Sequence, residues 1–196
     1  MKGELVQFKQ MRDYTHEEFV ELVSKLDERQ LMDFSANYGG YPVLFRMALD
    51  ERLSHIPFIQ TGSCVIIRNT KSQILLQERT DRNMWGLPGG CQNLGEDLRD
   101  TAAREVYEET SIWLDPHELV LIDTMSGSAR RNSYPNGDIV YNNVSLYLAD
   151  VDIDDASTLQ GDSETKRLEF FDIDELPANL MDADLVEAYK SYIREF

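Results

Sequence analysis

The stretch that decides the fold is residues 90–112, GCQNLGEDLRDTAAREVYEETSI. It is typical of a glycine-rich loop that leads into a helix. Three carboxylates of this helix, Glu105, Glu108 and Glu109, are spaced i, i+3 and i+4, so they share one helix face. Like charges at these spacings repel each other. The negative end of the helix macrodipole, near which they lie, makes this placement still less favourable.

Two interpretations of this glutamate face are open from the three residues themselves. It is either a solvated acidic face of an acidic protein or a site where a divalent cation offsets the repulsion. Hard cations such as Mg²⁺ prefer carboxylate oxygens as ligands. The spacing of the neighbouring residues is what separates the two interpretations.

That spacing resembles the signature of the Nudix hydrolases, G-x5-E-x7-R-E-U-x-E-E-x-G-U, in which U is apolar. The positions in register are Gly90, Glu96, Arg104, Glu105, Val106, Glu108, Glu109 and Ile112. A chance match of all eight is on the order of one in a million at average residue frequencies. One position departs from the signature, because Ser111 stands where the family has a glycine. A glycine just past a helix usually adopts a left-handed cap, so we expect Ser111 to be strained there.

The resemblance implies hydrolysis of a nucleoside diphosphate linked to another moiety, with Mg²⁺ or Mn²⁺ bound. It implies that Glu105, Glu108 and Glu109 are metal ligands, with Glu105 either a ligand or the group that orients the attacking water. The backbone carbonyl of Gly89 or Gly90 is expected to add an oxygen ligand. A second interpretation of Gly90 is a turn that needs a positive φ angle.

The resemblance also assigns supporting roles. Arg104 is expected to pair with a signature carboxylate and hold the ligands in place, and Glu96 is either that partner or an outer ligand. Family members often take a catalytic base from a loop before the last strand, where Glu164 lies six residues ahead of Phe170. The alternative for Glu164 is a solvated loop glutamate.

Three residues are candidates for substrate binding. Arg79 matches a family position that meets the nucleotide phosphates, although an isolated surface arginine is an equal alternative. Trp85 and Tyr134 could stack on a base or a ribose, with core packing the alternative for Trp85. The pair Arg130-Arg131 is either a phosphate or ribose contact or a solvated pair.

The remaining sequence predicts two parts, residues 1–56 and 57–196. The first is a helical extension, with a capping box at Thr15-His16-Glu17-Glu18 and a second helix over residues 41–53. The second alternates strands with helices over residues 97–111 and 183–194, and Asn136-Gly137 predicts a tight hairpin turn. Its order agrees with the α/β class, an α/β/α sandwich around a mixed sheet, that the resemblance implies.

Composition limits the partners. The chain has 196 residues and a formal net charge of −17, so its surface repels nucleic-acid polymers and anionic membranes. Two cysteines, Cys64 and Cys91, form no disulfide framework and favour a reduced, cytoplasmic location. Cys91 is expected to be a spectator thiol. No apolar run is long enough for a membrane span, and the N-terminus is not typical of a signal peptide.

Three functions compete. The first is hydrolysis of a small nucleotide such as ADP-ribose or a related sugar nucleotide, and its nearest rival is a housecleaning nucleoside triphosphate pyrophosphohydrolase. The second is a Nudix domain that senses a nucleotide without hydrolysing it, which usually goes with eroded signature glutamates. The third, removal of an RNA cap, needs a basic groove that the net charge argues against. The helical N-terminal segment favours a homodimer.

Overall fold

The computed structural model describes residues 57–80, 82–133 and 139–195, together with Thr15, Glu17, Glu18, Glu21, Ser24 and Lys25. The predicted capping box is confirmed. The Thr15 backbone N–H donates to Oε2 of Glu18 at 2.9 Å, and the Glu18 backbone N–H donates to Oγ1 of Thr15 at 3.2 Å. The helix predicted over residues 41–53 and the turn at Asn136-Gly137 lie outside the described residues.

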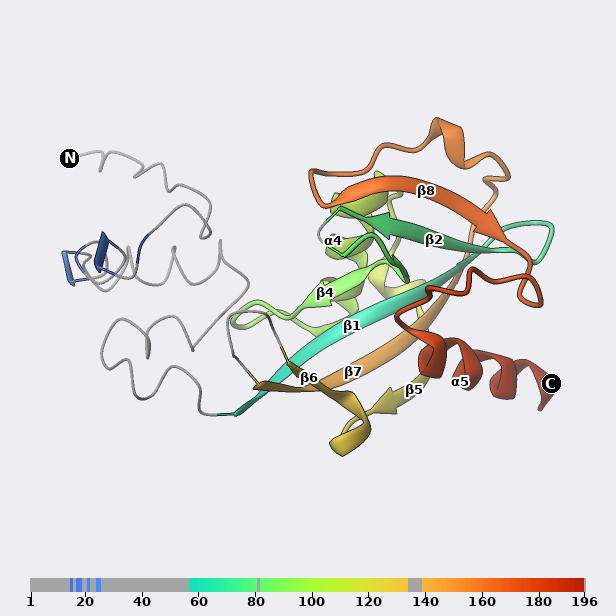
Figure 1. The fold of residues 1–196 in the computed structure, drawn as a ribbon. Helices are drawn as coiled ribbons and strands as arrows, with labels where there is room; N and C mark the ends of the chain where they lie inside the picture. Colours follow the sequence, from blue (N-terminus) through green and yellow to red (C-terminus); the bar gives the residue numbers. More distant parts are fainter. Residues whose placement is uncertain are drawn as a thin grey trace.

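Eight strands of the described part form one mixed, curled sheet (Figure 1). They are β1 Phe58–Arg68, β2 Ile74–Arg79, β3 Trp85–Gly86, β4 Gly89–Cys91, β5 Val120–Met125, β6 Arg131–Ser133, β7 Ile139–Asp150 and β8 Thr165–Phe171. Two α-helices accompany them, α4 Leu98–Thr110 and α5 Ala183–Arg194, with short 3₁₀ turns at Pro116–Glu118, Ser128–Arg130 and Ala156–Thr158.

The centre of the sheet is the long parallel pair β1 and β7, which run side by side from Phe58 opposite Val140 to Arg68 opposite Asp150. The main strand order is β3-β2-β1-β7-β5. Outside this order, β4 pairs with β1, β6 pairs with β7, and β8 pairs with β2. The β1–β2 connection is the hairpin that the sequence predicts, with Arg68 opposite Ile74. Because β4 pairs with β1, the loop that leads to α4 starts from the middle of the sheet.

Side chains alternate between the two faces of the sheet, so each face buries its own core. On β1, Val65 and Ile67 pack with Ala102 and Val106 of α4. Ile66, between them, packs instead against the core that contains Leu185 of α5. The two helices therefore cover opposite faces (Figure 1), which confirms the α/β/α sandwich.

Helix α4 begins and ends where the sequence predicts. Its N-cap is Asp97, whose side chain accepts a hydrogen bond from the Arg99 backbone N–H. Its C-cap is Ser111, with φ 62° and ψ 15°, which confirms the left-handed conformation of a non-glycine residue. Such a conformation costs on the order of 1 kcal/mol for a residue with a Cβ atom.

Helix α5 has the predicted bounds. Its apolar period predicts a face of five residues, and all but the last pack on the core: Leu185, Ala188, Tyr189, Tyr192 and Ile193. Leu185, Val186 and Tyr189 are buried, with Ala188 and Tyr192 partly buried against the same core. Ile193, expected on the apolar face, is 40% exposed. The predicted face is therefore confirmed except at its last position, Ile193. No helix of the described residues has the length and apolar character that crossing a membrane requires.

Candidate active site

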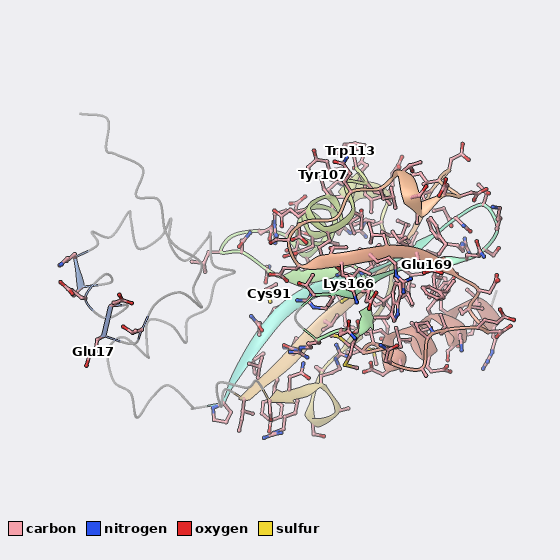
Figure 2. All side chains as sticks on the ribbon, turned by 45° about the horizontal axis from the view of Figure 1, so that its top comes forward. Glu17, Cys91, Tyr107, Trp113, Lys166 and Glu169 are labelled. Carbon is pink, nitrogen blue, oxygen red and sulfur yellow. The ribbon has the colours of Figure 1, made fainter. Side chains whose placement is uncertain are left out.

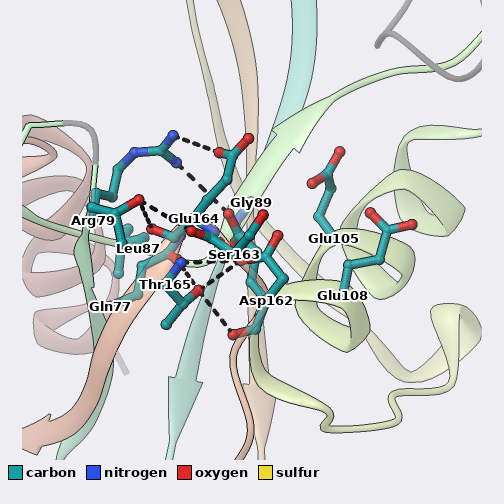
Figure 3. Close-up of polar contacts among 12 residues, drawn as sticks. Gln77, Arg79, Leu87, Gly89, Glu105, Glu108, Asp162, Ser163, Glu164 and Thr165 are labelled. Atoms are coloured by element: carbon teal, nitrogen blue, oxygen red, sulfur yellow. Dashed lines mark hydrogen bonds and ion pairs between the residues drawn. The ribbon is translucent and has the colours of Figure 1, made fainter. Parts of the chain in front are cut away.

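The three glutamates of α4 differ sharply in their surroundings. The side chain of Glu108 is 51% exposed, whereas those of Glu105 and Glu109 are 15% and 6% exposed. Figure 3 shows Glu105 and Glu108 projecting from the same side of α4. The face they share therefore runs from solvent, at Glu108, into the protein, at Glu109.

Arg104 connects this face to the loop before the helix. Its Nε and Nη2 donate to the two carboxylate oxygens of Glu96 at 2.7 and 3.0 Å. Its Nη1 donates to Glu105 at 2.8 Å and to Glu108 at 3.1 Å. The predicted pairing of Arg104 with a signature carboxylate is confirmed, and Glu96 is the bidentate partner. One guanidinium group thus holds three signature carboxylates.

Gly90 meets Glu105 directly. A Cβ atom at position 90 would lie 2.5 Å from the carboxylate carbon of Glu105, closer than any side chain allows. Gly90 is not a turn residue with positive φ, so that interpretation is wrong. It lies in β4, opposite Ser63, whereas its neighbour Gly89 has a positive φ angle. The glycine is needed because the strand and the carboxylate approach so closely.

Gly62 of β1 also allows a close approach, here between β1 and the backbone of Gly90. A Cβ atom there would collide with the carbonyl oxygen of Gly90. That carbonyl therefore lies against Gly62, and its role as a metal ligand stays a prediction.

Glu109 is anchored by β4 and β2. The Gly89 backbone N–H donates to its Oε2 at 2.8 Å, and the side chain of Gln77, buried in β2, also hydrogen-bonds to it. Burial raises the pKa of Glu109 to about 8, against the effect of these two hydrogen bonds. Burial likewise raises the pKa of Glu105, with Arg104 opposing it. Both carboxylates therefore lie where additional positive charge would be strongly stabilising.

Arg79, at the end of β2, links Glu109 to Glu164. Its Nη2 donates to Oε2 of Glu164 at 2.8 Å, and its Nη1 lies 3.7 Å from Oε1 of Glu109. Glu164 is 59% exposed and stands beside Arg79 on the loop before β8 (Figure 3). The structure thus brings both predicted residues to the glutamate face, Arg79 from the end of β2 and Glu164 from the loop before β8.

The charges of this network do not balance. The ion pairs of Arg79 and Arg104 join at least five described carboxylates, those of Glu96, Glu105, Glu108, Glu109 and Glu164, to two guanidinium groups. No three His, Cys, Asp or Glu side chains of the described part stand as a ready set of ligands around one point. The donors are nonetheless hard oxygens in excess over the available cations, and they fit Mg²⁺ or Mn²⁺ by chemistry.

Trp85 does not lie at this face. It is 5% exposed, its ring packs edge-on against Phe171 at 4.9 Å, and the Arg167 guanidinium lies 4.8 Å from its centroid. The expectation that it stacks on a base or ribose is therefore wrong, because both neighbours already cover the ring. Tyr134, the other predicted stacking residue, lies outside the described residues.

Arg130 is neither solvated nor free for phosphate. Its Nη1 donates to both carboxylate oxygens of Asp184 at 2.8 Å, and it lies 3.9 Å from Asp182. It therefore ties the turn before β6 to the start of α5. Arg131, next to it, is exposed.

Cys91 lies beside the acidic network, because its carbonyl oxygen accepts a hydrogen bond from Nη2 of Arg104 at 2.9 Å. Figure 2 shows it together with Tyr107 and Trp113. Burial raises the pKa of the Cys91 thiol to about 11. The thiol is then protonated near neutral pH, in agreement with a spectator role. Tyr107 and Trp113 are exposed on and just past α4, and the sheet does not cover them.

The structure adds two residues that the sequence did not single out, Gln77 and Thr165, and a contact of Ser111 that it did not predict. Gln77 and Thr165 sit on neighbouring strands and contact Glu109, and Ser111 reaches the loop that carries Glu164. Nothing in their local pattern identifies them, because each reaches the site through strand pairing or a loop contact. Ser111 alone carried a signal, as the position that departs from the signature.

The comparison with known proteins agrees with this geometry. The model of the NUDIX domain matches residues 59–196, which is more than half of the chain. The chain therefore belongs to the Nudix family.

Two relatives match shorter parts. Nudix hydrolase 7 of Arabidopsis thaliana is 46% identical over 71 residues, covering 34% of this chain and 24% of the relative. Nucleoside diphosphate-linked moiety X motif 6 of Mus musculus is 47% identical over 55 residues, covering 28% of this chain and 18% of the relative. The matches thus span a quarter or less of each relative's length.

Among solved structures, the NUDIX domain of Shewanella oneidensis NrtR complexed with ADP ribose has a TM-score of 0.55. The two chains are 17% identical over 69% of this chain and 89% of that one. At this identity the likeness concerns the fold.

Proposed function

We propose that this protein hydrolyses the pyrophosphate bond of a small nucleoside diphosphate derivative, ADP-ribose or a related sugar nucleotide, with Mg²⁺ or Mn²⁺ bound. The observation that carries the proposal is the surplus of at least five carboxylates over two arginines around one helix face. Glu105 and Glu109 are largely buried among these carboxylates, and a buried carboxylate without a full partner costs free energy that a bound cation would offset.

Glu105, Glu108 and Glu109 are the proposed metal ligands. When bound, the cation neutralises the pyrophosphate oxygens and lowers the pKa of water. Arg104 keeps Glu105 and Glu108 in place through its bonds to both and to Glu96. Gly89 and Gln77 do the same for Glu109.

Glu164 is the proposed general base, with Glu105 the alternative. It is exposed and stands opposite α4, so its carboxylate is available to a water molecule between the two. In the reaction, water attacks one phosphorus, the bridging P–O bond breaks, and the proton of water passes to the carboxylate. Arg79, which now bonds Glu164, is the proposed partner of the substrate phosphates.

A panel of nucleotides incubated with Mg²⁺ or Mn²⁺ tests the proposal. From ADP-ribose we expect AMP and ribose 5-phosphate. A nucleoside monophosphate and pyrophosphate from a triphosphate would instead support the rival housecleaning function. If no nucleotide of the panel is hydrolysed, both functions are contradicted.

Substitution of the ligands tests the metal assignment. E108Q and E109Q should each lower kcat by more than about 100-fold, since even groups that merely support ligands contribute about 10- to 100-fold. The matched control is E187Q, which changes a solvent-exposed glutamate on α5, across the sheet. Wild-type turnover in E108Q and E109Q would remove the assignment.

A nucleotide sensor without catalysis is the alternative from another class. The full set of signature glutamates argues against it. Calorimetry separates the two, because a sensor would bind ADP-ribose tightly and leave it intact in the presence of Mg²⁺.

The assembly and location of the protein stay predictions. We expect a homodimer to which residues 1–56 contribute, and sedimentation that shows only a monomer over a wide concentration range would contradict it. A cytoplasmic location is expected from the two free cysteines.

A further inference from the structure

The loop that carries Glu164 has few apolar contacts to fix it. Residues 160–164 are all exposed, and Leu159, just before them, is the nearest residue packed against the core. Hydrogen bonds must therefore determine where this loop lies. The residues that make these bonds also determine where the Glu164 carboxylate stands.

The first of these bonds comes from Ser111. Its hydroxyl donates to the carbonyl oxygen of Gln160 at 2.9 Å. Ser111 follows α4 directly, two residues after Glu109, in a left-handed conformation that glycine would adopt without strain. A glycine would cap the helix equally well but could not reach the loop. Compared with a glycine cap, Ser111 therefore adds backbone strain but gains a hydrogen bond to the loop that carries Glu164.

The loop is closed on itself, and its other end is fixed by Thr80, whose backbone N–H donates to the carbonyl oxygen of Glu164 at 2.8 Å. Ser111 therefore fixes the Gln160 end, and Thr80 fixes the Glu164 end. Asp162 Oδ1 accepts the backbone N–H groups of Glu164 at 2.9 Å and Thr165 at 3.1 Å. The Thr165 hydroxyl lies 3.3 Å from the carbonyl oxygen of Glu109. Figure 3 shows this tight turn of the chain facing α4, with Glu164 directed toward Arg79. The loop thus spans the end of α4 from Ser111 to Arg79.

We propose that Ser111 is a positioning residue that holds residues 160–164 against the C-terminal end of α4 and so sets the place of the Glu164 carboxylate over the glutamate face. This inference rests on the proposed function only in its kinetic part. The structural part, the tether itself, holds for any use of the site.

Hydrogen exchange tests the tether without any turnover. In S111G and S111A we expect the backbone amides of Glu164 and Thr165 to exchange about tenfold faster than in the wild type, because the loop opens more often. The control is S191A, which removes a comparable hydroxyl-to-carbonyl bond in α5. Unchanged exchange in both Ser111 variants would overturn the proposal.

The two variants also separate positioning from stability. S111G removes the backbone strain as well as the hydroxyl, whereas S111A keeps the strain. We expect S111G to melt at or above the wild-type temperature and S111A below it, while both show the same faster exchange and the same loss of activity. Activity that follows the melting temperature instead would contradict positioning.

Kinetics link the tether to Glu164. Both variants should lower kcat by about tenfold with KM changed less than about twofold, since misplacement of a catalytic group by 1 Å can cost up to about 100-fold. In an E164Q background, S111G should have no further effect on kcat. An equal loss in both backgrounds would overturn the link. Absence of wild-type turnover would count against the proposed function, while the exchange experiment would still decide on the tether.

Discussion

Gly90 of β4 and Glu105 of α4 approach so closely that a Cβ atom at position 90 would lie 2.5 Å from the carboxylate carbon of Glu105. This contact joins the centre of the sheet to the acidic face of the helix. It makes the position of one proposed metal ligand dependent on the absence of a side chain fifteen residues earlier, as counted from Gly90 to Glu105.

We expect G90A to displace Glu105 and to lower kcat by about 100-fold or more, because a ligand carboxylate moved by an ångström no longer binds in place. The unfolding free energy should change by less than about 1 kcal/mol, because the methyl group meets only the end of the flexible Glu105 side chain, which can move aside. Steady-state kinetics and chemical denaturation measure the two effects. The control is C91A at the next position, which should stay active. Wild-type activity in G90A would show that the contact relaxes freely.

Arg104 should not tolerate replacement by lysine. A lysine has one ammonium group and cannot bond Glu96 with two parallel N–H groups while also reaching Glu105 and Glu108. R104K should therefore lower kcat by about 10- to 100-fold and weaken activation by Mg²⁺, as groups that orient ligands do. R99K, on the same helix, should have little effect on kcat because Arg99 bonds the carbonyl of Leu119 away from the site. Equal activity of R104K and R99K would contradict this role.

Glu109 should make the metal-free protein less stable as pH rises. Burial raises its pKa in the folded state to about 8, above the ordinary 4.5. Between these values the folded state keeps a proton that the unfolded state has released, so the free energy of unfolding falls with increasing pH. Relative to E109Q, the wild type should lose roughly 3 kcal/mol between about pH 5 and pH 8. Urea denaturation with a chelator present measures this difference, and parallel curves for the two proteins would contradict it.

The raised pKa of Glu109 also predicts how stabilisation of the fold by Mg²⁺ depends on pH. A carboxylate must be deprotonated to bind the ion, so Mg²⁺ should raise the melting temperature more at pH 8.5 than at pH 6. E109Q should show a small rise at both pH values. A rise in the wild type that is independent of pH would mean that Glu109 is not a ligand.

The unequal burial of Leu185 and Ile193 on α5 predicts unequal effects of two truncations. L185A should lower the free energy of unfolding by about 2–5 kcal/mol, because Leu185 is fully buried between the helix and the sheet. I193A should lower it less, by about 1 kcal/mol, since Ile193 is 40% exposed. Denaturation of both variants measures this. A loss of unfolding free energy in I193A as large as that in L185A would contradict this prediction.

Periodicity and capping were enough to predict the helices because both depend on contacts within one or two turns. Asp97 and Ser111 mark the ends of α4 as expected, and α5 has the expected range. The same reasoning failed for Trp85, whose neighbours Phe171 and Arg167 come from β8 on a distant part of the chain. Whether an aromatic side chain meets a ligand or a core depends on what the sheet brings to it.

The sequence by itself determined that a helix would present Glu105, Glu108 and Glu109 on one face, since side chains three and four residues apart on a helix are neighbours whatever surrounds them. Only the tertiary structure decided that Glu109 is buried, that Gly90 leaves room for Glu105, and that Arg79 meets Glu164 from 85 residues away. Strand register and loop contacts produce these relationships. They depend on long-range pairing, which the local spacing of residues does not encode.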